Sequence, residues 1–303
     1  SKHQSKGATL YVSLEPCFHT GRTGPCVDVI VESQIKKVVI GRTDPNKRTN
    51  GKSIHKLRRA GISVVSGVLK EEATQINEIF FKYIQTGLPF VATKTAQSLD
   101  GKIATCCGDS QWITSKESRN YARKIRNEFD AILIGSQTLL KDNPNLNAQD
   151  KNKQIKKIIV DSSLKTPLTA QIFKNTLPQN CLIAVTPKVS LKKKNAFVQK
   201  GIQLIVCPQR KDGIDLKYLF KELAKREITS ILIEGGAHVI GSSLANKLVD
   251  KMYLYLSPKI FGDQSALSSV VGRKIKKVSE SIDLKQMSFK KIEEDVLLTG
   301  YLK

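Results

Sequence analysis

Residues 231–244 read ILIEGGAHVIGSSL and carry the clearest signal for the fold. An apolar strand ends in Glu234, and Gly235-Gly236 then opens a segment with a helical pattern. A strand that is apolar throughout is typical of a sheet covered on both faces. Backbone N–H groups at such a turn can hold a phosphate, and glycine permits its close approach. The stretch therefore predicts a strand–turn–helix unit of an α/β sheet, with a polar site where the strand ends.

The same alternation of strands and helices extends over residues 87–303. Helical patterns occur at 115–129 and 215–226. Because strands that alternate with helices form parallel sheets, we expect a mostly parallel central sheet, with a nucleotide as the default ligand beyond the carboxyl ends of its strands. The other expected strands are FVATKTA (90–96), DAILIG (130–135), KKIIVD (156–161), CLIAV (181–185), IQLIVC (202–207) and MYLYLSPKI (252–260).

Residues 8–68 form a shorter series of the same kind. Strands are expected at 8–14, 37–41 and 62–68, and helices at 26–34 and 52–61. This βαβαβ order predicts three parallel strands. A helical stretch then runs to Gly87, where we place the boundary between two α/β domains, 1–86 and 87–303.

The composition favours an ordinary folded protein of two domains, since 303 residues exceed the usual size of a single core. We find neither an apolar run of about 18 residues, the length that a membrane span needs, nor the apolar core of a signal peptide. The six cysteines are scattered through the chain, which favours thiols in a reducing compartment over disulfides. We therefore expect a cytoplasmic location and no membrane partner.

The loop EPCFHTGRTGPC (15–26) brings two cysteines, Cys17 and Cys26, close together after a strand. A zinc ion that activates water needs three protein ligands and one open position, and thiolates are suitable donors. The loop resembles the zinc loop of the cytidine-deaminase-like superfamily, in particular that of the riboflavin-biosynthesis pyrimidine deaminase. The resemblance implies an α/β/α deaminase fold with zinc held by Cys17 and Cys26.

In that family the third zinc ligand is the histidine of an upstream H-x-E motif, whose glutamate moves protons. None of His3, His19, His55 and His238 is followed two residues later by Glu. We therefore expect a truncated deaminase domain with incomplete zinc binding and lost deaminase activity. A fragment, a processed chain and a degenerate deaminase are equally compatible with the sequence. His19 is a less favoured substitute, because it lies too near Cys17 for tetrahedral geometry and supplies no proton shuttle.

The segment KTAQSLDGKIATCCGDSQWIT (94–114) resembles the reductase domain of the bifunctional riboflavin-biosynthesis enzymes, which is related in fold to dihydrofolate reductase. The likeness continues through 123–146, 158–164, 231–244 and 254–262. It implies that NADPH gives a hydride to the ribosyl C1 of 5-amino-6-(5-phosphoribosylamino)uracil, which yields the ribitylamino form. It also implies a homodimer or tetramer.

The resemblance further implies roles for individual residues. Lys94, Asp142 and Glu234 are the expected catalytic residues around C1. The substrate would contact Ser110, Arg126, Leu146 and Glu234, with the Arg126 guanidinium as a bidentate phosphate clamp. NADPH would contact Ala96, Trp112, Thr138, Asp142, Ser162, Gly235 and Gly236.

Structural alternatives stay open for four of these residues. Arg126 would face solvent on its helix, Trp112 would be a core aromatic, Lys94 would pair only with Asp100, and Asp142 would only cap a turn. The sequence also departs from the family pattern, because Gln149 stands near the position of an arginine that binds phosphate. Lys151 is a candidate replacement.

The formal net charge of +23 is compatible with a nucleic-acid partner or an anionic small molecule. The lysines are spread in short runs such as KNKQIKK (151–157) and LKKKN (191–195), with few aromatic residues among them. We interpret these runs as solvated surface without a function, and a nucleic-acid partner is not expected. The alternative is a basic nucleic-acid-binding module derived from a nucleobase deaminase, whose affinity would fall steeply with salt.

Overall fold

The computed structural model describes residues 5–21, 23–150, 152–211 and 213–302. The chain forms two compact units, which divide between Leu88 and Pro89. No helix among these described residues has the length and apolar character needed to cross a membrane.

The first unit is a small parallel sheet in the order β1-β2-β3. This arrangement confirms the predicted βαβαβ series. Its core is made by Val27, Val38, Ile40 and Leu57. The helical stretch predicted after residue 69 divides into two helices at Asn77, whose side-chain amide donates to the carbonyl of Ala73. The elements are β1 (Thr9–Leu14), α1 (Cys26–Glu32), β2 (Lys37–Arg42), α2 (Lys52–Arg59), β3 (Ser63–Ser66), α3 (Lys70–Ile76) and α4 (Glu78–Thr86).

The second unit is built on a nine-stranded sheet. Seven of its strands, from β13 to β9 in sheet order, are parallel, which confirms the expected α/β class with a mostly parallel sheet. In sheet order the strands are β15 (Leu284–Ile292), β16 (Asp295–Leu302), β13 (Lys251–Ser257), β4 (Phe90–Ser98), β12 (Ser230–Gly235), β6 (Ala131–Gly135), β7 (Lys156–Val160), β8 (Cys181–Val185) and β9 (Gln203–Val206).

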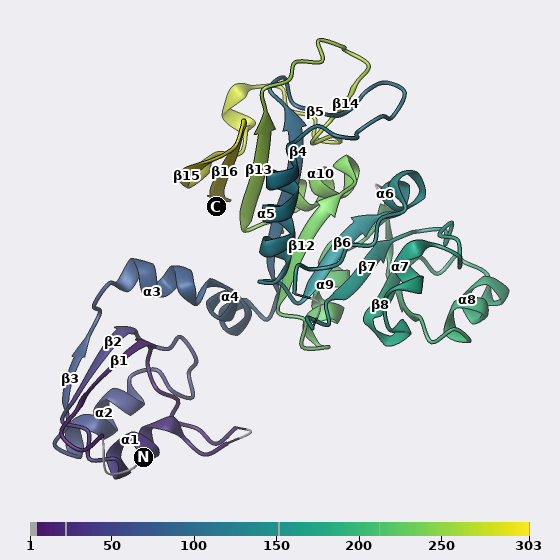
Figure 1. Ribbon diagram of the computed structural model, residues 1–303. Coiled ribbons are helices and arrows are strands. Elements are labelled where there is room, and N and C mark those ends of the chain that lie inside the picture. Colours follow the sequence, from purple (N-terminus) through teal and green to yellow (C-terminus); the bar gives the residue numbers. More distant parts are fainter. Residues whose placement is uncertain (1–4, 22, 151, 212, 303) are drawn as a thin grey trace. The chain divides into compact units, whose positions relative to one another are not determined.

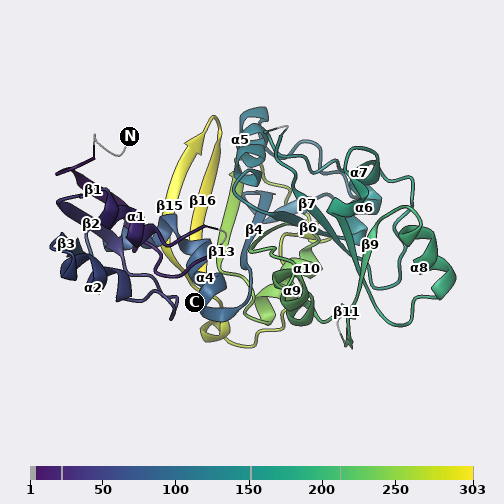
Figure 2. The same ribbon diagram turned by 90° about the horizontal axis from the view of Figure 1, so that it is seen from below.

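Helices cover both faces of this sheet. Figure 2 shows α5, α6 and α7 on one side of the strands and α9 and α10 on the other. Successive residues of one strand enter the two cores alternately: Leu133 packs with α9 and α10, whereas Ile132 and Ile134 pack on the opposite face. The helices are α5 (Lys116–Arg126), α6 (Ser136–Asp142), α7 (Gln171–Lys174), α8 (Leu191–Val198), α9 (Leu216–Ala224) and α10 (Ala237–Ala245).

An antiparallel hairpin, β15–β16, completes the sheet and was not predicted from the sequence. Seven consecutive side chains of β15 are exposed, so the strand lacks the apolar alternation that identifies a half-buried strand. Short pairs occur elsewhere, β5 (Lys102–Ala104) with β14 (Leu267–Ser268) and β10 (Gln209–Arg210) with β11 (Gly213–Ile214). Two 3-10 turns lie at Pro178–Asn180 and Val278–Glu280.

The strand order creates a switch in topology. From β6 the chain builds outward through β7, β8 and β9, and it then returns to insert β12 between β4 and β6 (Figure 1). Open α/β sheets bind their ligands at the carboxyl ends of strands where the order reverses in this way. The strand order therefore predicts a ligand site at the carboxyl ends of β4, β12 and β6.

Helix α10 leaves that edge in close contact with the chain at Val271. An added Cβ at Gly241 would overlap the carbonyl oxygen of Val271, which is backbone and cannot rotate away. We predict that Gly241→Ala lowers the free energy of unfolding by about 2 kcal/mol because the helix must shift outward. The urea midpoint by circular dichroism measures this, with Ser242→Ala as the control on the same helix. Equal midpoints for the two variants would contradict the packing described here.

Candidate active site

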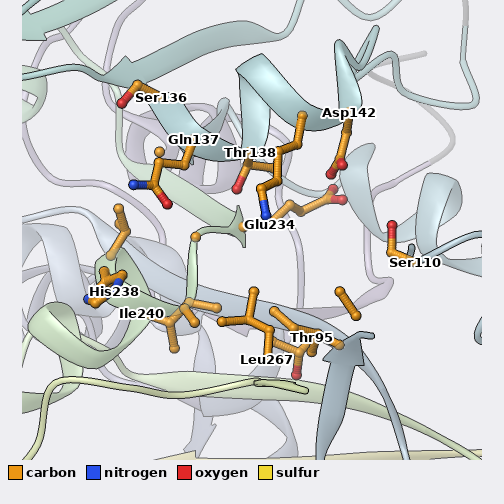
Figure 3. A pocket seen from close by; sticks show the side chains of 18 of the residues that line it. Thr95, Ser110, Ser136, Gln137, Thr138, Asp142, Glu234, His238, Ile240 and Leu267 are labelled. Carbon is orange, nitrogen blue, oxygen red and sulfur yellow. The ribbon is translucent and has the colours of Figure 1, made fainter. Parts of the chain in front are cut away.

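A cavity of about 680 Å³ lies at the carboxyl ends of β4, β12 and β6. In Figure 3, Ser136, Gln137, Thr138 and Asp142 of the α6 segment form one wall, and Ile240 and Leu267 lie on the opposite side. Most of the residues expected at the site line this cavity. They are Lys94, Ala96, Ser110, Trp112, Thr138, Asp142, Ser162, Glu234, Gly235 and Gly236.

The polar centre of the cavity is a buried cluster of one carboxylate and two cations. Arg126 donates from Nε and Nη2 to the two oxygens of Glu234, at 2.6 and 2.8 Å. The Lys94 ammonium lies 3.7 Å from the second of these oxygens and 5.9 Å from the ring centre of Tyr255. Only 4% of the Glu234 side chain is exposed. The three charges come from α5, β4 and β12, so the cluster forms only when the sheet is assembled.

Burial and pairing set the protonation of this cluster. Burial acts to raise the pKa of Glu234, but the charges of Arg126 and Lys94 outweigh it, so the pKa lies below its ordinary value. Burial lowers the pKa of Lys94, with the Glu234 charge opposing the shift and Arg126 adding to it. At neutral pH the cluster therefore combines an ionised carboxylate with an ammonium that gives up its proton more readily than a free lysine.

The position of Arg126 differs from the one expected for a phosphate clamp. Its guanidinium is occupied by Glu234 on one side, and Nη1 donates to the carbonyl oxygen of Asn147 at 2.7 Å. It is not among the residues that line the cavity, and it does not face solvent as the structural alternative proposed. The geometry makes it a partner of Glu234, because a carboxylate satisfies the same bidentate donor pair that a phosphate would.

Lys94 and Asp100 are not paired, so the structural alternative for Lys94 was wrong. Asp100 instead accepts from the hydroxyl of Ser98 and from the backbone N–H groups of Phe261 and Gly262. These bonds hold the turn after β4 to the segment after β13 and keep the pKa of Asp100 at about 2. Among the carboxylates of the described residues, Lys94 pairs with Glu234 alone.

The α6 wall brings Thr138 and Asp142 into the cavity. Burial raises the pKa of Asp142, with Lys141 opposing the shift, so this carboxyl is more easily protonated than a surface aspartate. Asp142 is the last residue of α6, and the following residue, Asn143, has a left-handed backbone. Lys141 also lines the cavity and was not identified from the sequence.

Glycines bring β12 and α6 unusually close together. An added Cβ at Gly235 would lie 2.8 Å from Cγ2 of Thr138, and Gly236 has a φ of +83°, which favours glycine. Gly235, Gly236 and Ala237, where β12 ends and α10 begins, line the cavity. Such a turn accommodates the close approach of a diphosphate, so these residues fit a dinucleotide.

The loop that carries Ser110 and Trp112 covers the other side of the cavity. Trp112 is 59% exposed, so it is not the core aromatic of the structural alternative. The Arg119 guanidinium stacks 4.2 Å from its ring centre and donates to the carbonyl of Thr114, and Lys259 donates to the carbonyl of Trp112. Arg119 and Thr114 also line the cavity. Neither residue was identified from the sequence, since Arg119 stands in a helix rich in basic residues.

Leu146, expected at the substrate, lies elsewhere. Its side chain is buried in the hydrophobic core beneath α6 and does not line the cavity. It has a left-handed backbone, and its neighbours Asn145 and Asn147 make the polar contacts of this loop. Gln149, near the expected phosphate-binding arginine, donates its backbone N–H to Arg123. Lys151, the candidate replacement, lies outside the described residues.

The cysteine loop of the first unit brings two thiols together. The backbone N–H of Cys26 donates to Sγ of Cys17 at 3.1 Å, so the two cysteines adjoin as expected. Within the described ranges no three His, Cys, Asp or Glu side chains gather in a way that could hold a metal. His19 contacts the hydroxyl of Thr49 instead. Two thiols alone do not satisfy the three-ligand set of a catalytic zinc.

The charge cluster predicts a pH-dependent loss of stability. Glu234→Gln leaves Arg126 and Lys94 buried without their counter-charge, so we predict a loss of about 3–5 kcal/mol at pH 7. Because the pKa of Glu234 is lowered on folding, its ionisation stabilises the fold above its ordinary pKa of 4.5, and this contribution is lost as the pH falls through the folded value.

Urea unfolding of wild type and Glu234→Gln between pH 3 and pH 8 measures both the loss and its pH dependence. The exposed Glu117→Gln on α5 is the control, with an expected change of about 0.5 kcal/mol or less. A difference between wild type and Glu234→Gln that stays constant below pH 4.5 would contradict an ionised Glu234.

Two known families match the chain. The RibD C-terminal domain matches residues 89–298, and the zinc-binding region of cytidine and deoxycytidylate deaminases matches residues 1–42. The riboflavin biosynthesis protein RibD of Actinobacillus pleuropneumoniae is 41% identical over 298 residues, which cover 98% of this chain and 79% of that protein. The RibD protein of Aquifex aeolicus is 40% identical over 297 residues, which cover 97% of this chain and 81% of that protein.

Solved structures agree with these matches. RibD of Acinetobacter baumannii superposes with a TM-score of 0.87 at 30% identity, covering 100% of this chain and 83% of that one. The deaminase/reductase of Thermotoga maritima gives 0.80 at 33% identity, with 98% and 80% covered. The riboflavin biosynthesis reductase Rib7 of Saccharomyces cerevisiae gives 0.57 at 25% identity, with 76% and 100% covered. The chain therefore belongs to the RibD family of riboflavin-biosynthesis proteins, with a reductase domain and a fragment of a deaminase domain.

Proposed function

We propose that the second unit reduces 5-amino-6-(5-phosphoribosylamino)uracil to its ribitylamino form with NADPH as the hydride donor. The observation that carries this proposal is the buried Lys94–Glu234–Arg126 cluster on the cavity at the strand switch point. The substrate is the one printed in the name of the Thermotoga maritima relative. A cavity of about 680 Å³ is of the size that small-molecule and cofactor sites have.

NADPH would lie against Gly235, Gly236 and Thr138, which line the cavity where β12 ends and α10 begins, because the first backbone N–H groups of a helix can bind a diphosphate. Ala96, Trp112 and Ser162 complete the expected contacts, since each lines the same cavity. When bound, the cofactor supplies the hydride that adds to the ribosyl C1. The protein has to orient the sugar and supply the proton that ring opening requires.

Opening of the ribosyl ring breaks the bond between C1 and the ring oxygen. The oxygen takes up a proton. The lone pair of the exocyclic nitrogen forms a second bond to C1, which gives a cationic C=N group. We assign the role of proton donor to Lys94, because burial lowers its pKa. The ionised Glu234 stabilises the positive charge at C1 until hydride addition removes it. Asp142, whose pKa burial raises, orients the sugar hydroxyls from the α6 wall.

For the first unit we propose no catalytic role in this chain. Cys17 and Cys26 adjoin, but the described residues offer no third ligand and no proton shuttle beside them. Release of ammonia from the diaminopyrimidine precursor by the purified chain would contradict this. The homodimer or tetramer stays a prediction, which sedimentation equilibrium measures.

The catalytic assignment predicts that Lys94→Met and Glu234→Gln each lower kcat by about 10²- to 10⁴-fold. The first variant removes the proton donor, and the second removes the carboxylate that stabilises the positive charge at C1. Loss of reduced-nicotinamide absorbance with the ribosylaminopyrimidine substrate measures this. Lys192→Met, an exposed lysine on α8, is the matched control and should retain the wild-type rate. Unchanged turnover in Glu234→Gln would overturn the assignment.

The cofactor assignment predicts that Gly235→Ala weakens NADPH binding about tenfold, since the added methyl group meets Cγ2 of Thr138. The double variant Gly235→Ala/Thr138→Ser lacks that Cγ2 methyl group and should recover part of the affinity. Quenching of Trp112 fluorescence measures the dissociation constant without substrate, so this result does not depend on turnover. Equal affinity of wild type and Gly235→Ala would place the cofactor elsewhere.

A further inference from the structure

Two adjacent cysteines, Cys106 and Cys107, stand in the loop that carries Ser110 to the candidate active site. They are the central residues of a tight turn, because the backbone N–H of Gly108 donates to the carbonyl of Thr105 at 2.9 Å. Both side chains are exposed, and the two sulfur atoms lie 3.8 Å apart. We call this pair the turn dithiol, and the proposed reduction does not use it.

The turn dithiol differs from the other two cysteines of the second unit. Cys181 and Cys207 are fully buried in its core. Burial raises the pKa of the Cys181 thiol to about 11 and that of the Cys207 thiol to about 12. Because the thiolate is the reactive form of cysteine, these two residues are inert core side chains. Thiol chemistry in the second unit is therefore confined to Cys106 and Cys107.

Hydrogen bonds distinguish the two members of the pair. The pKa of Cys106 is raised, first by its hydrogen bond with Cys107 and then by that with Asp263. Asp263 lies between β13 and β14 and also accepts from the hydroxyl and the backbone N–H of Ser265. Cys106 therefore keeps its proton when Cys107 ionises, which makes Cys107 the first nucleophile and Cys106 the second.

The same turn fixes the loop that lines the cavity. The hydroxyl of Thr105 accepts from the backbone N–H of Asp109, and Oδ1 of Asp109 accepts from the backbone N–H of Gln111. Ser110 and Trp112, which line the cavity, stand on either side of Gln111 in the chain. A change in the backbone of the turn is therefore transmitted to both residues through these bonds.

A disulfide between the adjacent cysteines would change this backbone. The two sulfur atoms have to approach from 3.8 Å to the disulfide bond length of about 2.05 Å. Adjacent Cα atoms are about 3.8 Å apart across a trans peptide, which is closer than the roughly 4.4–6.8 Å that disulfides prefer. The bond therefore closes only if the turn alters its shape, and the resulting strain makes the bond easy to reduce.

We propose that Cys106 and Cys107 are a site of reversible oxidation, at which a small disulfide such as oxidised glutathione converts the two thiols into a disulfide that slows the reductase site. The exposed position of both thiols gives the oxidant access, and their separation of 3.8 Å places the second thiol beside the first. The loss of activity rests on the proposed function, whereas the oxidation itself does not.

The reaction consists of two successive thiol–disulfide exchanges. Cys107 attacks one sulfur of the oxidant, which forms a mixed disulfide and releases the other half of the oxidant as a thiol. Cys106 then attacks the sulfur of Cys107, which closes the bond within the turn and releases the second thiol. The two cysteine protons pass to the two released thiols, so two cysteines are oxidised and one external disulfide is reduced. A small thiol in excess reverses both steps.

Mass spectrometry of the full chain equilibrated with oxidised glutathione tests the site without NADPH or substrate, so its failure is separate from failure of the reductase function. The starting protein is Cys17→Ser/Cys26→Ser, which lacks the thiols of the first unit. Trypsin cuts after Lys102 and Lys116 and releases the pair in the peptide 103–116. We expect this peptide to lose the mass of two hydrogen atoms and to regain it with dithiothreitol.

A single variant of the starting protein tests the second exchange. Cys106→Ser lacks the second nucleophile, so its peptide should retain one glutathione on Cys107 instead of forming the disulfide. A starting protein whose peptide keeps both thiols, or retains glutathione as the variant does, would contradict the proposed oxidation.

The effect on the site is measured in the same samples. Trp112, the single tryptophan of the chain, stacks on Arg119 of α5, so its fluorescence without ligand should change on oxidation and return with dithiothreitol. NADPH turnover should fall at least about tenfold, because a small misplacement of site residues costs rates of this size. The double variant Cys106→Ser/Cys107→Ser is the matched control and should keep its rate in the oxidant.

Protein that carries the disulfide and keeps its Trp112 fluorescence, or keeps its turnover, would overturn the effect on the reductase site. The fluorescence result decides the matter even if the reduced protein has no turnover, so failure of the proposed function does not hide failure of this inference.

Discussion

The buried ion pair between Arg126 and Glu234 is the interaction on which the site depends. Neither charge is tolerable alone in this interior, because removing one partner leaves the other desolvated without compensation. The pair joins α5 to β12 over 108 residues of sequence, and Lys94 adds β4 to the same cluster. The three elements meet only when β12 inserts between β4 and β6. Formation of the sheet and formation of the site are therefore one event.

Local patterns were sufficient to predict most of the sheet. Runs such as ILI (231–233) and AILIG (131–135) are apolar at every position because both faces of their strands are covered, and this signal does not depend on distant residues. The polar groups at the strand ends were predictable for the same reason, since parallel strands bring their carboxyl ends to one edge. The β15–β16 hairpin carries no such signal. It is held by backbone pairing with β13, while Met287 and Phe289 face solvent.

Pairings across the sheet were not predictable from single residues. The resemblance placed Arg126 and Glu234 in the same site, but whether the guanidinium holds a phosphate or a carboxylate is decided by which acceptor the fold brings within reach. Leu146 was expected at the substrate from its place in a motif, yet its backbone is left-handed and its side chain is buried in the core. The interpretation of Lys157 as a surface residue was wrong for a different reason. Composition marked its run as surface, whereas the strand period puts it on the same buried face as Ile159.

Part of the high positive charge of the chain lies in the interior of the second unit. Lys94, Arg126 and Lys157 all lie inside the second unit, and Glu234 is the only carboxylate that pairs with any of them in the described part of the chain. The interior thus holds more positive than negative charge around Asn147, in a region where water screens poorly. A ligand that brings phosphate groups restores the balance, and a neutral one does not. Most of the lysines are on the surface, as their runs indicate, but Lys157 is buried within β7 and Lys94 is largely buried beside Glu234.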